Sequence, residues 1–225
     1  MTLFPDLRPV APPPPPAGVD LRCCPCQEIV ADSSGAKLII ADPPWSYSQA
    51  AGVADPSLQY GVLSMADIVA ILASFHGPNR RLALWMTWPQ LGEWMRLTQG
   101  WVWGDVKSGG SWHKSGPGGV GYHWLGFSEP VLLYVSGSPG CGKWDSLKNA
   151  HDSPREGHSV KPVDWMRGWI RRWTDPGDLV VEPFAGRGSG ACATAAENRR
   201  YLGAEIDPDR HAQALTALAR YLETL

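Results

Sequence analysis

The chain has 225 residues, which is enough for one large domain with a sizeable hydrophobic core. Hydrophobic residues make up 44% and charged residues 19% of the chain, values that are ordinary for a globular protein. The formal net charge of −2 excludes a strongly basic protein, so any surface that binds nucleic acid must be local.

The sequence also indicates a cellular compartment. No apolar run approaches membrane-spanning length, and the N-terminal residues lack the basic and apolar regions of a signal peptide. The odd number of cysteines, five, favours a reduced, intracellular chain. Three of them form the cluster Cys23, Cys24 and Cys26, which lacks a fourth ligand and the usual C-x₂-C spacing of a metal site. We therefore expect small buried thiols there and no metal.

Tryptophan is unusually frequent, with twelve residues. A large amphipathic ring contributes much to core packing. We expect most of the tryptophans to lie in the core or between helices, and only a few to serve a functional site.

The N-terminal segment differs in composition from the rest of the chain. Residues 1–20 include five consecutive prolines, 12–16, and few residues that build a core. Such a segment favours an extended polyproline tail without a fixed fold. We therefore divide the chain into a Pro-rich tail, 1–20, and a folded domain, 21–225, which begins with a short edge element reaching about residue 30.

Buried strands and amphipathic helices then alternate along the chain. Apolar runs predict strands at 37–41, 82–86, 101–107, 131–135, 179–182 and 201–205. Periodic apolar residues predict helices at 65–75, 89–98, 162–173 and 190–199, and a last helix from 208. Ser64 with Asp67, and Asp207 before Pro208, are typical of helix N-termini. This alternation predicts an α/β fold with a mostly parallel sheet and helices on both faces.

Three long connections are expected between these elements. Residues 46–63 form a loop that carries Tyr47, and residues 137–158 form a polar connection. Residues 108–122 are rich in glycine, which indicates a mobile loop that closes over a site.

The first candidate site is Asp42-Pro43-Pro44-Trp45. The two prolines end the preceding strand, since neither carries a backbone N–H for the ladder. Asp42 is therefore expected at the carboxyl end of a strand, where open α/β sheets bind ligands. A carboxylate, a proline carbonyl and an indole face suit a planar base with an exocyclic amine: the oxygens accept its N–H groups and the indole stacks on its ring.

The second candidate site is the glycine-containing stretch 183–190, which runs from a strand into a helix. Glycines allow a ligand to approach the backbone closely, as at nucleotide sites. Glu205 ends the next strand, where an acidic residue commonly holds ribose hydroxyls. Together these features indicate an adenosine-containing cofactor. No G-x-x-x-x-G-K-[ST] pattern is present, which argues against an NTPase.

These stretches resemble the DPPW family of adenine-N6 methyltransferases, which includes the catalytic subunit of the mRNA adenine methyltransferase and bacterial and phage relatives. The resemblance spans about residues 21–225 and keeps the permuted order of that family, with the catalytic tetrapeptide first and the cofactor stretch last. Its further blocks are Trp103-x-x-x-Lys107, Gly121-Tyr122-His123-Trp124-Leu125 leading to Glu129, His158-Ser159-x-Lys161-Pro162, Glu182-Pro183-Phe184-Ala185-Gly186 and Gly203-x-Glu205-Ile206.

The resemblance implies a Rossmann-like S-adenosylmethionine-dependent methyltransferase. It implies catalytic roles for Asp42, Pro43, Pro44 and Trp45. It implies cofactor binding by Asp42, Gln27, His158, Lys161, Phe184, Gly186, Arg187, Gly188 and Glu205. It implies substrate binding by Trp45, Tyr47, Lys107 and Glu129. Gln27 enters this set because relatives often have an acidic residue near this position, where the chain offers Cys24, Cys26 and Gln27.

The implied substrate is adenine in DNA. An aspartate before the two prolines favours adenine-N6, whereas serine or threonine is more frequent in cytosine-N4 enzymes. The stretch Phe184-Ala185-Gly186-Arg187-Gly188 is more similar to bacterial DNA methyltransferases than to the mRNA enzyme. The alternatives are cytosine-N4 methylation, RNA adenine-N6 methylation and a non-catalytic nucleic-acid-binding partner. A cytoplasmic location in a bacterium or phage-infected cell follows, with a homo-oligomer or partner subunit as a possibility that the small size leaves open.

Overall fold

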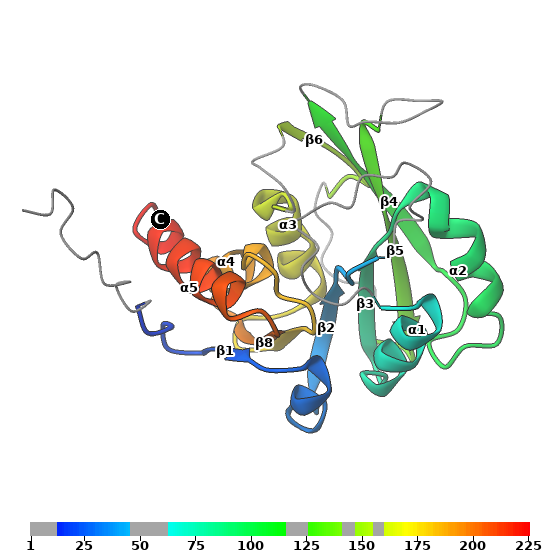
Figure 1. Ribbon diagram of the computed structural model, residues 1–225, viewed down its shortest axis with the longest axis horizontal. Coiled ribbons are helices and arrows are strands. Elements are labelled where there is room, and N and C mark those ends of the chain that lie inside the picture. Colours follow the sequence, from blue (N-terminus) through cyan, green and yellow to red (C-terminus); the bar gives the residue numbers. More distant parts are fainter. Residues whose placement is uncertain (1–12, 46–62, 116–125, 141–146, 155–159) are drawn as a thin grey trace, which may run out of the picture.

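The computed structural model describes residues 13–45, 63–115, 126–140, 147–154 and 160–225 (Figure 1). Its centre is an eight-stranded sheet with the order β1-β8-β7-β2-β3-β5-β4-β6. The strands are β1 (Val19–Cys23), β2 (Ala36–Ala41), β3 (Arg80–Trp85), β4 (Ser108–Ser115), β5 (Ser128–Ser136), β6 (Ala150–Pro154), β7 (Leu179–Glu182) and β8 (Arg200–Glu205).

Most neighbouring strands are parallel. β1, β8, β7, β2 and β3 form one parallel block, and β4 and β6 are parallel to each other. Within the described sheet, only β5 runs antiparallel to its neighbours, which are β3 and β4. The predicted mostly parallel sheet is confirmed. The strand before the Asp-Pro-Pro-Trp stretch lies at its centre, flanked by β7 and β3.

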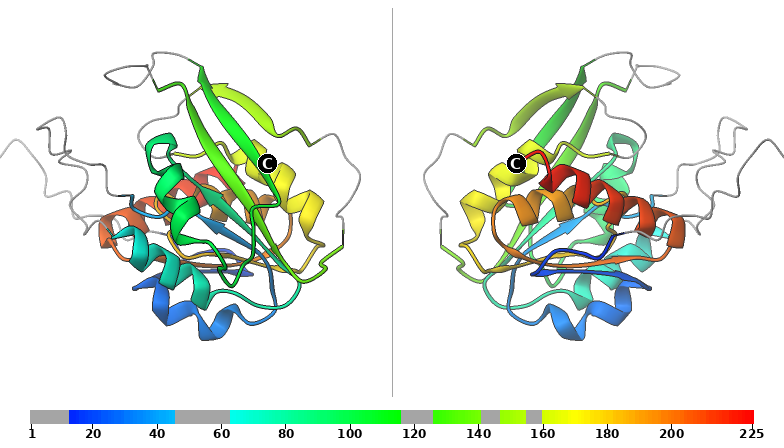
Figure 2. Two further views of the ribbon diagram at one scale, coloured as in Figure 1. Left: turned by 90° about the vertical axis from the view of Figure 1, so that its right-hand side faces the viewer. Right: turned by 90° about the vertical axis from the view of Figure 1, so that its left-hand side faces the viewer.

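Helices cover both faces of the sheet (Figure 2). One face carries α1 (Met65–Ser74), α2 (Leu91–Leu97) and the 3₁₀ turns η1 (Cys26–Ile29), η2 (Ala31–Ser33) and η3 (Trp88–Gln90). The other carries α3 (Val163–Trp173), α4 (Ser189–Ala196) and α5 (Pro208–Leu222). Within β2, Ile39 packs in the cluster that contains α1, whereas Leu38 and Ile40 pack in the cluster that contains α3. Alternation along a strand that is buried on both faces explains the continuous apolar run.

Two helix N-termini have the caps that the sequence predicts. The Ser64 hydroxyl oxygen accepts a hydrogen bond from the Asp67 amide at 3.1 Å, in front of α1. The Asp207 carboxylate accepts hydrogen bonds from the Asp209 and Arg210 amides, in front of α5. These contacts satisfy amides that have no partner within the helix.

The predicted strand at 101–107 is wrong, and the glycine-rich segment after it begins with a strand, β4. Trp101 and Trp103 are held by side-chain packing: the Trp103 indole donates to the Leu72 carbonyl at 2.8 Å, and Trp101 packs edge-to-face on Tyr134. Gly104 has φ +73°, which breaks an extended run. In β4, a Cβ on Gly110 would lie 2.9 Å from the Trp165 ring, so glycine allows α3 to pack directly on the strand.

The sheet edges also differ from the expectation. The predicted polar connection 137–158 contains the edge strand β6, which is short, mostly polar and alternates in burial. At the other edge, the predicted element ending near residue 30 is the strand β1 followed by two 3₁₀ turns. β1 begins at Val19, two residues before the expected start of the fold. The division into tail and domain stays a prediction, since residues 1–12 lie outside the described part.

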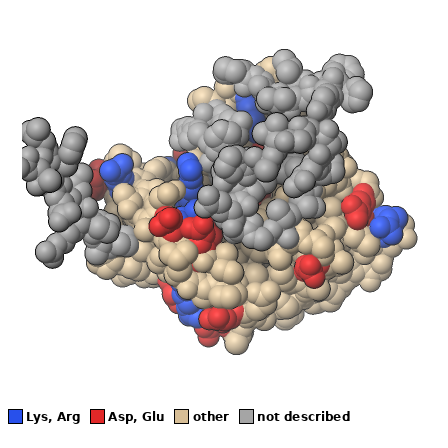
Figure 3. Space-filling view, viewed as in Figure 1, with Lys and Arg blue, Asp and Glu red and all other residues tan. Residues whose placement is uncertain are grey.

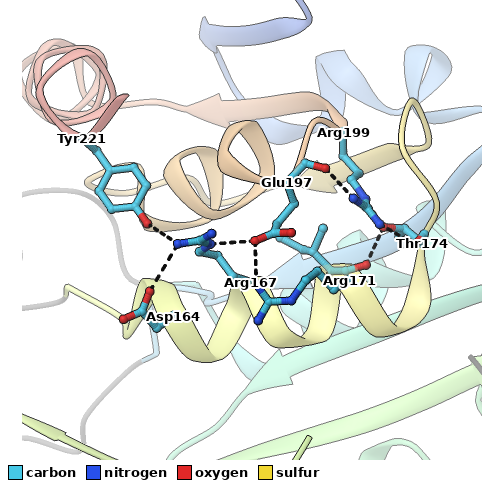
Figure 4. Close-up of polar contacts among 8 residues, drawn as sticks. Asp164, Arg167, Arg171, Thr174, Glu197, Arg199 and Tyr221 are labelled. Atoms are coloured by element: carbon cyan, nitrogen blue, oxygen red, sulfur yellow. Dashed lines mark hydrogen bonds and ion pairs between the residues drawn. The ribbon is translucent and has the colours of Figure 1, made fainter. Parts of the chain in front are cut away.

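A polar network ties α3 to the turn between α4 and β8 (Figure 4). The buried Glu197 carboxylate accepts hydrogen bonds from Arg167 at 2.7 Å and from Arg171 at 2.8 Å. Arg199 donates to the Thr174 side chain and carbonyl at 2.9 and 2.7 Å. These bonds anchor α3, and with it the segment that precedes α3 and reaches the candidate site.

The helices in the described ranges are short. The longest, α5, has 15 residues. None of them is long and apolar enough to cross a membrane.

Candidate active site at the carboxyl end of the sheet

Asp42 directly follows β2 at the carboxyl end of the parallel block. β7 ends at Glu182 and β8 at Glu205, at the same edge of the sheet. The first and second candidate sites of the sequence therefore meet at one edge, as expected for an open α/β sheet.

Lys161 joins two carboxylates at this edge. Its ammonium group lies 2.8 Å from Asp42 Oδ2 and 3.2 Å from Glu129 Oε2. Lys161 precedes α3, and Glu129 lies near the start of β5. The fold thus brings together residues that the sequence assigned to three different roles.

Lys114 completes a charge cluster of four residues: Asp42, Lys114, Glu129 and Lys161. It lies near the end of β4 and pairs with Glu129 Oε1. The cluster contains two cations and two carboxylates. Lys114 is absent from the predicted site residues because the glycine content of 108–122 indicates a loop. The alternation of Trp112 and Lys114 on one strand face is the signal that could have found it.

The electrostatics of the cluster follow from burial and pairing. Burial opposes the charge of Lys161, but Asp42 and Glu129 outweigh it and raise the pKa of Lys161. Burial likewise favours neutral Glu129, yet Lys161 and Lys114 hold its pKa below the ordinary value. The pKa of Asp42 is raised, because burial and the nearby Glu129 outweigh the attraction of Lys161. Asp42 is therefore the carboxylate of the cluster whose surroundings favour the protonated form.

Lys161 is held from two further sides. Its ammonium lies 5.2 Å from the centre of the Trp85 ring, within cation–π range. Its backbone amide donates to the Ser189 hydroxyl at 3.2 Å, at the start of α4. These contacts orient Lys161 toward Asp42.

Glu205 and the glycine stretch form the second part of the site. Glu205 Oε2 accepts a hydrogen bond from the Gly186 amide at 2.8 Å, and Oε1 accepts one from the Asp207 amide at 2.9 Å. Burial raises the pKa of Glu205, against the effect of these amides. Each carboxylate oxygen keeps a second acceptor position that a ligand hydroxyl can use.

The glycine stretch has an open backbone turn. Gly186 and Gly188 have φ of +54° and +83°. A Cβ on Gly186 would meet no atom within 4 Å, whereas one on Gly188 would lie 3.0 Å from Ala214 on α5. Glycine at position 188 thus permits α5 to pack against this turn, and Gly186 leaves open space beside the backbone. Phe184 is half-buried against the core and Arg187 is exposed.

Gln27 also lies at this edge. It belongs to η1, which follows the carboxyl end of β1, and Cys23 of β1 pairs with Glu205 of β8. Its side chain is exposed. Of the neighbouring cysteines only Cys26 is buried, and Cys23 is exposed, so the prediction of three buried thiols holds for Cys26 alone. The reason is that β1 is an edge strand. Among the described residues, no group of three or more potential ligands is placed to hold a metal ion.

A buried carboxyl group lies behind the glycine stretch. Glu182 ends β7 and accepts a hydrogen bond from the Tyr201 hydroxyl at 2.5 Å. Burial, the largest cause, raises the pKa of Glu182 to about 8, although the hydrogen bond from Tyr201 opposes this shift. Gly190 makes room for this group, since a Cβ there would overlap the Glu182 carboxyl group.

Trp45 occupies a core position. Its side chain is 4% exposed and packs edge-to-face on Trp94, with ring centres 5.9 Å apart. Pro43 is buried and Pro44 half-buried. The stacking of Trp45 on a base stays a prediction, and the contact with Trp94 argues against it in this conformation.

One other predicted site residue, Lys107, is not brought to the cluster. Lys107 is exposed just before β4, and its amide donates to Leu133 at 2.8 Å, several residues along the sheet from the carboxyl edge. Tyr47 and His158 lie outside the described residues. Their roles stay predictions.

Solved methyltransferase structures share this fold. M1.HpyAVI in complex with SAM covers 89% of this chain and 100% of its own, with a TM-score of 0.67 and 20% identity. TTHA0409 of Thermus thermophilus, complexed with S-adenosyl-L-methionine, covers 92% and 95%, with a TM-score of 0.69 and 18% identity. The cytosine-N4-specific PvuII DNA methyltransferase covers 95% and 93%, with a TM-score of 0.63 and 11% identity. The chain therefore has a Rossmann-like methyltransferase fold, as predicted.

Sequence comparison identifies the family. The N6_N4_Mtase model, described as DNA methylase, matches residues 90–216, more than half of the chain. The chain belongs to this DNA methylase family. The type II methyltransferase M.XycI of Xanthomonas campestris pv. cyanopsidis is 31% identical over 90 residues, 39% of this chain and 28% of the relative. YubD of Escherichia coli K12 is 33% identical over 82 residues, 35% of this chain and 36% of the relative. The matches thus span about a third of these curated relatives.

Proposed function

We propose that the chain transfers a methyl group from S-adenosylmethionine to the exocyclic N6 of adenine in DNA. The observation that carries this proposal is the position of Asp42. It lies at the carboxyl end of the central strand, in ionic contact with Lys161, in a chain of the DNA methylase family. The Asp-Pro-Pro-Trp stretch makes the DPPW subtype the proposed branch of that family.

The residues at this edge fit the cofactor. S-adenosylmethionine supplies a methyl group that is already activated on a sulfonium centre. Gly186 leaves open space beside the backbone, where an adenosine moiety can approach. Glu205, held by two backbone amides, offers acceptor positions for ribose hydroxyls. Lys161 offers a fixed cation for the carboxylate of the amino-acid end.

The remaining proposed cofactor contacts come from the same edge. Gln27, Phe184, Arg187 and Gly188 surround the glycine stretch or follow the neighbouring strand β1. His158 keeps its predicted role near Lys161. The assignment of His158 rests on the resemblance alone, and the other four rest on the resemblance and on their position at the carboxyl edge.

Asp42 is the proposed catalytic group. The lone pair of an exocyclic amine is delocalised into the ring, so the nitrogen is a poor nucleophile. Hydrogen bonds from the amine to the Asp42 carboxylate and to a proline carbonyl favour a pyramidal nitrogen whose lone pair is available. The carboxylate also stabilises the positive charge that develops on the nitrogen. Holding amine and donor in line supplies much of the rate.

Substrate contacts are proposed for Glu129, Trp45, Tyr47 and Lys107. Glu129 has the strongest structural support, because Lys161 links it to Asp42. On the face in Figure 3, acidic and basic side chains are interspersed and uncharged atoms cover most of the described surface. A DNA contact surface is therefore expected to be local.

Cytosine-N4 methylation is the second candidate. The family model covers both amino-methylating types by name, and a cytosine-N4-specific enzyme shares the fold. The aspartate of the tetrapeptide favours adenine, and the bacterial-type glycine stretch favours DNA over RNA. The proposed location is the cytoplasm of a bacterial or phage-infected cell.

The test is an isotope-transfer experiment with the purified chain. The protein is incubated with methyl-labelled S-adenosylmethionine and with DNA or RNA, and the products are digested to nucleosides and analysed by mass spectrometry. We expect labelled N6-methyladenine from DNA, and none with the Asp42→Ala variant. Labelled N4-methylcytosine as the only product would show that the target base is cytosine and not adenine. Label in RNA alone would show that the substrate is RNA and not DNA. No label in either nucleic acid would refute the methyltransferase proposal.

A further inference from the structure

Trp88 differs from the other tryptophans of the described part. Ten of the twelve tryptophans lie in the described ranges, and nine of these ten are in ring–ring contacts with other aromatic side chains. Trp88 is the exception. It is 54% exposed, whereas most of the others are buried. Core packing, which explains the high tryptophan content, does not explain this residue.

The exposed Trp88 side chain is fixed by a hydrogen bond. Its indole Nε1 donates a hydrogen bond to the Ser128 hydroxyl at 3.0 Å, which connects η3 to the start of β5. This bond holds the ring by its polar edge. About half of the residue surface stays exposed and can contribute contact area to a planar ligand.

A second exposed aromatic residue lies beside the same strand. Phe127 directly precedes Ser128 and is 45% exposed. Its carbonyl accepts a hydrogen bond from the Lys114 amide at 2.7 Å, which fixes its backbone next to the charge cluster. The half-exposed Phe127 ring and the Trp88 ring are therefore attached to the same end of β5.

Both rings lie next to the candidate active site. β2 and β3 pair Ala41 with Leu84, so the next step of the register places Asp42 level with Trp85, three residues before Trp88. Phe127 is two residues before Glu129, which reaches Asp42 through Lys161. The two rings therefore border the edge at which the target base is proposed to bind.

We propose that Trp88, assisted by Phe127, stacks on a nucleobase that neighbours the target base of the nucleic acid. This inference rests on the proposed function and extends it to the contacts that hold the strand around the target. Aromatic side chains stack on bases with little sequence preference. Such contacts do not require a basic surface, which agrees with the net charge of −2.

A protein partner fits this surface less well. Two half-exposed rings supply roughly 200 Å² of apolar area, taking half of about 150–250 Å² for each ring. A stable protein interface buries about 800 Å² on each partner. The exposed apolar area of the two rings is instead of the size that one stacked base can cover.

The experiment couples the Trp88 ring to a single base. An oligonucleotide that the wild-type chain methylates is prepared with an abasic site at each position flanking the target, up to three on either side. Binding is measured by fluorescence anisotropy with wild type, Trp88→Ala, Trp88→Phe and Phe127→Ala. Met95→Ala, which removes an exposed apolar side chain of α2, is the matched control.

We expect Trp88→Ala to weaken DNA binding by roughly 5- to 150-fold, the range for one stacked base. Trp88→Phe retains most of the affinity, Phe127→Ala has a smaller effect, and Met95→Ala binds like wild type. The turnover at saturating DNA, the affinity for S-adenosylmethionine and the melting temperature stay at wild-type values. At one abasic position the difference between wild type and Trp88→Ala disappears.

Three results would overturn the inference: unchanged DNA affinity of Trp88→Ala, an equal penalty at every abasic position, or a wild-type dimer that Trp88→Ala converts to monomer. A wild-type chain that methylates DNA normally while Trp88→Ala binds equally well refutes this inference alone. A wild-type chain that methylates no nucleic acid refutes the proposed function as well. If RNA is the substrate, the same scan with abasic RNA applies.

Discussion

The ammonium group of Lys161 lies 2.8 Å from the carboxylate of Asp42 and so joins the segment before α3 to the end of the central strand β2. Glu129 and Lys114 extend this contact to the antiparallel strands β5 and β4. The result is a half-buried cluster whose charges balance. In such a cluster the loss of one member leaves its partner uncompensated.

Replacing Lys161 by methionine is expected to shift the pH dependence of methyl transfer. The pKa of Asp42 is already raised by burial, and Lys161 opposes this shift. Without Lys161 the pKa of Asp42 rises further, so the acidic limb of the kcat/KM profile moves to higher pH. The measurement is the pH–rate profile of both proteins. An unchanged acidic limb would contradict the proposal that ionised Asp42 is the reacting form.

Substitutions of Lys114 and Lys107 show which of the two lysines contributes to catalysis. The resemblance assigns Lys107 to the substrate, whereas the structure places Lys114 on Glu129 and leaves Lys107 exposed. We expect Lys114→Met to lower kcat/KM at least about tenfold, or about 1.4 kcal/mol, because Glu129 then has Lys161 as its only partner in the cluster and competes more strongly with Asp42 for this ammonium group. Lys107→Met is expected to change it less than about twofold, as for most surface substitutions.

Both variants are measured by steady-state kinetics, with Lys114→Arg as the rescue variant. Arginine keeps the positive charge beside Glu129, so it is expected to recover part of the activity. If Lys107→Met had the larger effect, the assignment of Lys114 as a positioning residue would be wrong.

Where local signals determine structure, the sequence was sufficient. The apolar run 37–41 with its two following prolines predicted β2 and the position of Asp42, and Ser64 predicted the start of α1. The step from β7 through the glycines into α4 was equally local. Each of these elements depends on neighbours in sequence.

Distant aromatic contacts determined what the sequence did not predict. The segment 101–107 resembles a strand, but Trp101 and Trp103 find partners on α1, α2 and β5. Gly109 and Gly110 suggest a loop, yet the close approach of Trp165 requires a glycine at position 110 of β4. Lys114 was missed for the same reason. The burial of Trp45 against Trp94 is likewise a contact between distant segments.

Trp45→Ala is expected to lower the stability of the fold. The side chain is buried in the core with an edge-to-face contact to Trp94, so its removal leaves a cavity. The expected cost is about 3–5 kcal/mol in the free energy of unfolding, the range for buried aromatic residues. Urea denaturation measures this cost. A variant with wild-type stability and weakened DNA binding would instead support the stacking role.

Glu205→Gln is expected to weaken binding of S-adenosylmethionine by about 1.5–3 kcal/mol, the scale for hydrogen bonds to a charged group. The amide nitrogen that replaces one oxygen cannot accept from Gly186 or Asp207, so the cofactor loop also loses a support. Calorimetry gives the affinity. Glu28→Gln, which changes an exposed carboxylate of η1, is the control and is expected to bind like wild type. Equal affinity in all three proteins would place the cofactor elsewhere.

Glu182 is expected to make the stability of the fold depend on pH. Its pKa is about 8 in the folded chain, mainly because the carboxyl group is buried, against an ordinary value of 4.5. Between these two values the unfolded chain releases the proton while the folded chain keeps it. The free energy of unfolding therefore falls as the pH rises through this window. Glu182→Gln removes the titrating group and keeps an oxygen that accepts from Tyr201.

Urea denaturation of wild type and Glu182→Gln at pH 5, 7 and 9 isolates this contribution, because the other titrating groups are common to both proteins. Stabilities within about 1 kcal/mol of each other, the scale of one ordinary hydrogen bond, are expected at pH 5, where Glu182 is protonated in the fold and both proteins keep the bond from Tyr201. The variant is expected to gain on wild type at pH 7 and further at pH 9. Tyr201→Phe removes the hydrogen bond that opposes the shift, so its own decline should extend to higher pH than that of wild type. Parallel pH curves for wild type and Glu182→Gln would show that Glu182 is ionised in the folded chain at neutral pH.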